Sequence, residues 1–258
     1  MLTDWCNKLG CLLRNTIIKN VKVKQTKQEQ EQVTEQKQEI KINNLNYEYV
    51  HGKMFTKPPT WIVIHYTACA NVSAKQMCKS MRKNTTASTH FYVDENDIYT
   101  SVPMEYVAWH VGNGQCKQPS SKKLTLEELS NYKCNDWRYD LAAKNHIKWK
   151  SNNDDFTGNS ISIGVDMCVK KKSTSTLKAT DLDWYFEDNT IENTAKLVAY
   201  LMNLYNINID HIIRHGDCTG KICPAPFVYP FEEGDMKWES FKEKVSNYQK
   251  IGVTLIES

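Results

Sequence analysis

The hydrophobic pattern of the chain alternates between short apolar runs and longer amphipathic stretches. Two apolar, β-branched runs, TWIVIHYTA at 60–68 and SISIGVDMCV at 160–169, predict strands that are buried on both faces. The stretch THFYVDENDIYTSVP at 89–103 predicts two strands joined by a turn, and IDHIIRH predicts a strand that ends at His215. Gly164, inside the second apolar run, predicts a close approach by another part of the chain.

One segment, NTIENTAKLVAYLMNLYNI, has helical periodicity. Asn189 and Glu192 stand three residues apart and predict a capping box at its start. The predicted apolar face consists of Ile191, Ala195, Val198, Met202 and Tyr205. Because helical and strand segments interleave, we predict an α/β fold: a single domain with a central mixed β-sheet flanked by helices.

The polar segments divide the chain. Residues 24–44 are dominated by Gln, Glu and Lys and predict a linker, since they offer little apolar surface to bury. Residues 1–23 are expected to form a short amphipathic helical segment before it, and residues 45–258 the main domain. Residues 113–159 form a long polar connection, which we interpret as an insertion near the functional site.

Composition excludes several classes of protein. The net charge of +3 in 258 residues is too balanced for a nucleic-acid-binding surface, and no apolar run approaches the ~18 residues of a membrane helix. The first residues lack the apolar core of a signal peptide, so we expect the protein to accumulate in the cytoplasm of the producing cell. None of the nine cysteines forms a CxxC pair, which favours free thiols over a zinc knuckle or redox site.

Three residues form a candidate metal site. His65 and His215 each end a predicted strand, and Cys223 follows in a loop between two glycines and two prolines. Each alone is more often a buried structural residue than a ligand. Together they supply two imidazoles and a thiolate with no fourth cysteine or histidine at ligand spacing, which is typical of a catalytic Zn²⁺ site with an open position.

Five ordered motifs then give the chain a specific resemblance. IVIHYTA, STHFYVDENDIY, VAWHVG, NSISIGVDM and RHGDCTGKICP resemble the zinc-dependent N-acetylmuramoyl-L-alanine amidases over residues 45–245. This family includes phage lysins and peptidoglycan recognition proteins, and the resemblance is closest to clostridial-type phage or prophage endolysins. It implies a peptidoglycan substrate, in which the amide between N-acetylmuramic acid and L-alanine is cleaved after release of the enzyme to the cell wall.

The resemblance also implies roles for individual residues. His65, His215 and Cys223 match the zinc ligands, and Lys221 matches a lysine that stabilises the oxyanion. Asp166 stands where recycling amidases carry a glutamate, which implies an acid/base role. Its shorter side chain leaves open a second interpretation, a carboxylate that hydrogen-bonds a zinc-binding imidazole.

Two further residues are assigned to the substrate side of the site. His110 matches a substrate-binding histidine of the family. Thr89 stands where phage-type relatives carry a tyrosine, and a threonine hydroxyl cannot take up a proton at neutral pH. The neighbouring Trp109 is expected to pack in the core.

Two other functions remain open at this point. One is a non-catalytic peptidoglycan-binding module, although such modules typically lack the third ligand that Cys223 would supply. The other is a cysteine peptidase with Cys223 as nucleophile, which would need a metal-free, exposed thiolate and would survive chelation.

Overall fold

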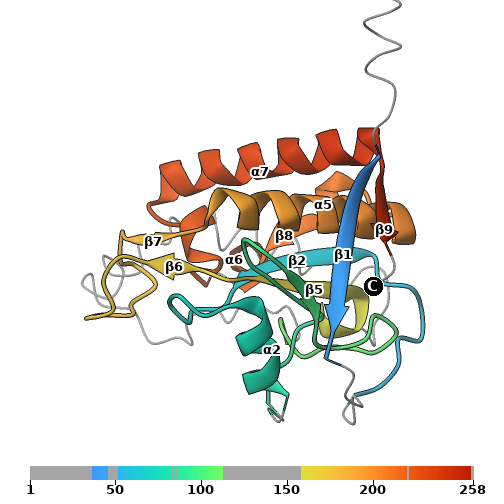
Figure 1. The fold of residues 1–258 in the computed structure, drawn as a ribbon, viewed down its shortest axis with the longest axis horizontal. Helices are drawn as coiled ribbons and strands as arrows, with labels where there is room; N and C mark the ends of the chain where they lie inside the picture. Colours follow the sequence, from blue (N-terminus) through green and yellow to red (C-terminus); the bar gives the residue numbers. More distant parts are fainter. Residues whose placement is uncertain are drawn as a thin grey trace, which may run out of the picture. The chain divides into compact units, whose positions relative to one another are not determined.

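A seven-stranded mixed β-sheet forms the centre of the computed structural model (Figure 1). The strands lie in the order β8-β2-β5-β3-β4-β1-β9. Only β3 and β4 pair antiparallel among these neighbours; the other pairs are parallel. The strands are β1 (Gln38–Asn44), β2 (Trp61–Tyr66), β3 (Phe91–Val93), β4 (Ile98–Thr100), β5 (Ser162–Met167), β8 (Ile212–Arg214) and β9 (Val253–Ile256). The structure describes residues 37–45, 52–82, 84, 86–112, 158–219 and 221–256.

Helices cover both faces of this sheet. The long helices α5 and α7 lie side by side on one face, and α2 lies on the other (Figure 1). The helical elements are α2 (Ala74–Met81), α5 (Asp188–Tyr205), α6 (His215–Thr219), α7 (Phe231–Ile251) and the 3₁₀ turns η1 (Gly158–Ile161), η2 (Ile209–His211) and η3 (Ala225–Phe227). A two-stranded sheet joins β6 (Lys170–Lys171) to β7 (Trp184–Tyr185). The predicted α/β fold with a mixed central sheet is confirmed.

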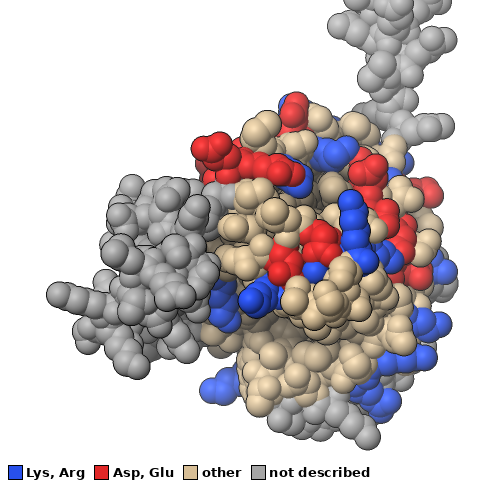
Figure 2. All heavy atoms as spheres, turned by 90° about the vertical axis from the view of Figure 1, so that its left-hand side faces the viewer, with Lys and Arg blue, Asp and Glu red and all other residues tan. Residues whose placement is uncertain are grey.

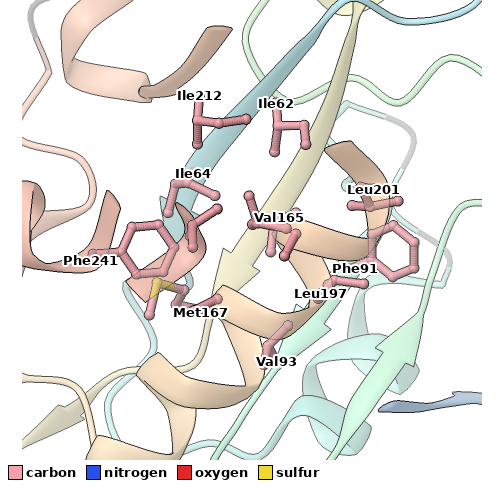
Figure 3. Packing of buried hydrophobic residues seen from close by; sticks show 14 of the residues in the cluster. Ile62, Ile64, Phe91, Val93, Val165, Met167, Leu197, Leu201, Ile212 and Phe241 are labelled. Atoms are coloured by element: carbon pink, nitrogen blue, oxygen red, sulfur yellow. The ribbon is translucent and has the colours of Figure 1, made fainter. Parts of the chain in front are cut away.

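The main core lies between the sheet and helices α5 and α7. Alternate residues of the central strands point into it, because successive side chains of a strand point to opposite faces. Figure 3 shows this packing, with side chains from β2, β3, β5 and β8 meeting those of α5 and α7. The labelled residues are Ile62, Ile64, Phe91, Val93, Val165, Met167, Leu197, Leu201, Ile212 and Phe241. The alternation leaves His65 and Asp166 on the opposite face of the sheet.

The predicted helix exists, but its predicted cap is wrong. Helix α5 begins at Asp188 with Glu187 as the N-cap residue, so Asn189 already lies inside the helix. Glu192 does not fold back on the helix start. It binds instead across to α7, where it pairs with Lys244 and accepts a hydrogen bond of 2.5 Å from the Tyr248 hydroxyl. A tertiary ion pair has replaced the local capping interaction.

The boundary of the main domain lies earlier than the sequence suggested. Residues 38–44, which we assigned to the linker, form β1 and pair with β4 and β9. Ile40 is buried there, so this stretch contributes to the core despite its polar neighbours. The predicted N-terminal segment, the rest of the linker and residues 113–157 of the predicted insertion lie outside the described residues.

Charge is distributed without a dominant sign. Figure 2 shows acidic and basic side chains interleaved over part of one face, beside a broad area without charged residues. Within the described part of the chain, no helix is both long enough and apolar enough to cross a lipid bilayer.

Candidate metal centre and active site

The ends of three adjacent parallel strands build the site. Strand β2 lies between β8 and β5, and the Cα of His65 pairs in register with that of Asp166. His215 follows directly after β8 as the first residue of α6. Because parallel strands end at the same edge of a sheet, these side chains converge there, as expected for the sites of open α/β sheets.

The structure brings together the three residues predicted as metal ligands. The ligand atoms of His65, His215 and Cys223 all lie within 4.8 Å of one another, and all three residues are buried. Cys223 Sγ lies 3.9 Å from His65 Nδ1. Ligand atoms around a tetrahedral zinc are separated by about 3.3–3.6 Å, given Zn–N and Zn–S bonds of about 2.0–2.3 Å. The group therefore fits a single metal ion after small side-chain movements.

Burial sets the protonation of these groups. It lowers the pKa of His65 well below its ordinary value and lowers that of His215 to about 3, with the nearby Lys221 charge adding to both effects. Both imidazoles are therefore neutral, which is the form that binds metal. Burial also raises the pKa of the Cys223 thiol to about 12. The thiol is therefore protonated at neutral pH, and a bound metal ion would convert it to the thiolate.

A buried ion pair fixes the loop that carries His215 and Cys223. The Arg214 guanidinium donates to both carboxylate oxygens of Asp217 at 2.8–3.1 Å and to Asp235 of α7 at 2.6 Å. Asp217 also accepts from the Arg214 backbone N–H. The Gly216 N–H donates to the Cys223 carbonyl at 2.7 Å, which joins the two ligand-bearing segments. The ligand loop is thus held from both sides.

Asp166 has the properties of a carboxylate that exchanges protons near neutral pH. Burial raises its pKa to about 7, and the neighbouring Thr89 hydroxyl has a smaller, opposing effect. Asp166 lines a cavity of about 690 Å³, together with His65, His215, Cys223 and Lys221. Lys221 is exposed and contributes its charge to the same cavity.

His110 contacts His65, one of the three candidate metal ligands. Its Nδ1 is 2.9 Å from His65 Nε2, and its Nε2 is 3.2 Å from the Ser162 hydroxyl. Both ring nitrogens are therefore engaged by the protein, although the ring also lines the cavity. Gly164 confirms the predicted close approach, because a Cβ there would lie 2.7 Å from the His110 ring and 2.9 Å from the Thr89 hydroxyl.

The cavity has walls that sequence reasoning missed. Met77 and Met81 of α2 line one side, and residues 178–180 line another. The latter segment is held by Lys171, which is buried and pairs with Asp181 and Asp183. A buried lysine inside the run KKK carries no sequence signal that separates it from the half-buried Lys170 and the exposed Lys172.

The prediction for Trp109 is wrong. Its side chain is 41% exposed and lines the cavity instead of packing in the core. The Trp109 backbone N–H donates to the Ser88 hydroxyl, and the Trp109 backbone carbonyl accepts from the Ser88 N–H. These two bonds fix the rim of the cavity at this point. The adjacent His110 in the motif AWH was the available signal that Trp109 belongs to the site.

The site lies at an edge of parallel strands, where a buried His-His-Cys group, a carboxylate and a lysine surround one cavity. These features define the class: an α/β protein with a candidate single-metal hydrolytic centre. The chain belongs to the N-acetylmuramoyl-L-alanine amidase family, which matches residues 55–226.

Two similar relatives are Bacillus proteins. The amidase BlyA of Bacillus subtilis is 28% identical over 76% of this chain and 45% of its own length. CwlL of Bacillus licheniformis is 26% identical over 72% of this chain and 40% of its own length. The chain thus spans less than half of either relative. The expected closeness to clostridial enzymes is at most a minor feature beside these matches.

A solved structure supports the fold. The structure of PlyL matches with a TM-score of 0.50 and 21% identity, covering 80% of this chain and 96% of PlyL. At this identity the likeness shows the shared fold alone.

Proposed function

We propose that the protein is a zinc-dependent N-acetylmuramoyl-L-alanine amidase that hydrolyses the amide between N-acetylmuramic acid and L-alanine in peptidoglycan. The observation that carries this proposal is the convergence of His65, His215 and Cys223 within 4.8 Å, at a cavity that also holds Asp166 and Lys221. Family membership and the names of the relatives support the bond that is cleaved.

His65, His215 and Cys223 would hold the zinc ion. When bound, zinc supplies a Lewis acid and lowers the pKa of water toward neutrality. The chain offers it two neutral imidazoles, because burial lowers their pKa values, and a thiol whose proton would be released to solvent when the metal binds. This combination of nitrogen and sulfur ligands is typical of zinc.

Asp166 would act as the acid/base. A carboxyl whose pKa is raised to about 7 is divided between its two protonation states at neutral pH, so it can accept a proton from attacking water and return it to the leaving amine. Its Cα is the register partner of His65 across the parallel pair β2–β5, which supports a position beside the scissile bond. The alternative role, an acceptor for a ligand imidazole, is less favoured for His65, because its Nε2 is already engaged by His110.

Lys221 would stabilise the negative charge that develops on the carbonyl oxygen. Lys221 lines the cavity, and its charge lowers the pKa of both ligand histidines. Removing an oxyanion donor of this kind lowers kcat by about 10²–10³-fold. His110, which lines the cavity, would contribute to its substrate side. Thr89 is buried beside Asp166 and does not line the cavity, so it would act on the substrate only through Asp166.

Two alternatives remain distinguishable. A cysteine peptidase is disfavoured, because a buried thiol with a pKa of about 12 is not an activated nucleophile. A non-catalytic peptidoglycan-binding module would bind cell walls without releasing amines. We further propose that the protein acts on the cell wall as a phage or prophage endolysin, the role that the sequence resemblance implies.

The deciding experiment is digestion of purified Gram-positive cell walls, with and without a zinc chelator. The amidase predicts new L-alanine amino termini, no new reducing sugar ends, and loss of this activity on chelation with recovery after zinc is returned. Lys221→Ala should retain zinc while losing activity, and Lys237→Ala, on the surface of α7, is the matched lysine control. Wall binding without release of amines would favour the recognition module, and chelator-resistant release would favour the peptidase.

A further inference from the structure

A chain of hydrogen bonds leads from the candidate metal centre into the protein. His65 faces Cys223 with Nδ1 and faces His110 with Nε2, at 3.9 and 2.9 Å respectively. His110 in turn faces Ser162 with its other nitrogen: the hydroxyl lies at 3.2 Å and the backbone carbonyl at 3.4 Å. The Ser162 hydroxyl donates to the Gly158 carbonyl at 2.6 Å.

The partners at the inner end set the direction of every hydrogen in this chain. The Gly158 carbonyl can only accept, so the Ser162 hydroxyl must donate its hydrogen to that carbonyl. The Ser162 backbone carbonyl also can only accept, so His110 Nε2 must carry a hydrogen. A neutral imidazole with a hydrogen on Nε2 has a bare Nδ1, which can only accept from His65 Nε2. His65 Nδ1 is then left without a hydrogen, and its lone pair points toward Cys223.

We propose that His110 is a positioning residue for the metal centre, which fixes His65 in the tautomer whose Nδ1 lone pair is free to bind the metal. Ligating histidines commonly donate their second N–H to a carboxylate or carbonyl. Here a second imidazole takes that place, and it is itself oriented by backbone groups. The inference rests on the proposed metal site and goes beyond it, because it assigns the role of His110 through His65.

The surroundings of His110 are built to hold its ring. The Asn159 side-chain carbonyl accepts hydrogen bonds from three successive backbone N–H groups, those of His110, Val111 and Gly112, at 2.8–3.0 Å. The absence of a side chain at Gly164 leaves the space that the ring occupies. The Asn159 bonds fix the backbone that carries the ring, and a rotation of the ring would break its own contacts with His65 and Ser162.

The first test reads the tautomer directly. In the full-length, metal-free protein labelled with ¹⁵N-histidine, ring-nitrogen chemical shifts should show the hydrogen of His65 on Nε2. In His110→Phe, which keeps the ring and removes both nitrogens, the Nδ1–H form of His65 should become populated. In His110→Asn, whose side-chain oxygen can replace Nδ1 as acceptor, the Nε2–H form should be retained. A hydrogen on Nδ1 of His65 in the unaltered protein would overturn the inference.

The second test measures zinc affinity by competition with a chelator. His110→Phe should weaken it by about 10–100-fold, with partial recovery in His110→Asn. His211→Phe is the control, because the His211 side chain bonds the Thr60 carbonyl and stacks on Trp61. Unchanged affinity in a folded His110→Phe would contradict the proposal. Should that variant fail to fold, the tautomer of the unaltered protein still decides.

The two proposals fail differently. If the unaltered protein binds no zinc, the proposed function fails, while the tautomer of His65 still tests the role of His110. If zinc binds tightly and His65 nevertheless carries its hydrogen on Nδ1 in the metal-free protein, only the role of His110 is lost.

Discussion

Gly164→Ala should destabilise the protein, because Gly164 of β5 lies directly against the His110 ring. The new Cβ would lie 2.7 and 2.8 Å from two ring atoms of His110 and 2.9 Å from the Thr89 hydroxyl. Ordinary contact begins near 3.4 Å, so the ring must withdraw by about 0.7 Å. The strand cannot yield instead, because the Gly164 N–H donates to His90 Nδ1 and its carbonyl accepts from the His90 N–H.

The expected loss follows from two opposing effects. Overpacking a rigid site costs about 1–3 kcal/mol, and the upper end applies because neither side can move. Replacing glycine by alanine returns about 0.4–1 kcal/mol by restricting the unfolded chain. The net loss in the free energy of unfolding should be about 2 kcal/mol, measured by urea denaturation of the metal-free protein.

A double mutant separates this clash from a general defect of the strand. In the background His110→Ala the ring is gone, so Gly164→Ala should cost clearly less there than in the unaltered protein. Equal losses in both backgrounds, or an unchanged urea midpoint in the single variant, would refute the assignment of Gly164 to the space needed by His110.

Four further outcomes are expected. The value of kcat/KM should fall as pH drops below about 7, since the Asp166 carboxylate is then protonated. A profile of kcat/KM against pH that still shows this fall in Asp166→Asn would contradict the assignment. Zinc binding at pH 7 should release about one proton, because the Cys223 thiol is protonated without metal. Calorimetry in buffers of different ionisation enthalpy measures the number of protons released, which should be lower in Cys223→Ser. Asp217→Asn should lower the free energy of unfolding by about 3 kcal/mol, the lower end for a broken buried pair because Asp235 still contacts Arg214. The exposed pair of Lys237 with Glu233 is its control, where Lys237→Ala should change the unfolding free energy by less than about 1 kcal/mol.

The central part of the fold was predictable because burial on both faces leaves a plain signal. The run 60–68 contains β2, and β3 and β4 form a hairpin around the predicted turn. Strand β1 was missed since its apolar positions stand among glutamine, glutamate, lysine and asparagine, and its partner β9 lies near the other end of the sequence. Local composition carries no information about such a distant partner.

The candidate site, like the fold, was predictable from the sequence only in part. The positions of His65, His215 and Cys223 depend on strand ends and one short loop, which sequence patterns can locate. The contact of His65 with His110 depends on how far a loop from another strand reaches, and only the folded chain determines that distance. The exposure of Trp109 is likewise decided by the shape of the cavity rim, because an aromatic residue beside a buried alanine could face either way.

The pairing of β1 with β9 has a consequence during synthesis on the ribosome. Gln38 pairs with Val253, so the outer edge of β1 has no partner until nearly the whole domain has emerged. Until then β1 offers unpaired backbone N–H and C=O groups to any neighbouring nascent chain. Pairing over such a sequence distance is also slow. A chain that stops before residue 253 should therefore be prone to aggregate even though its metal-ligating residues are complete, and the last strand acts as the closing step of assembly.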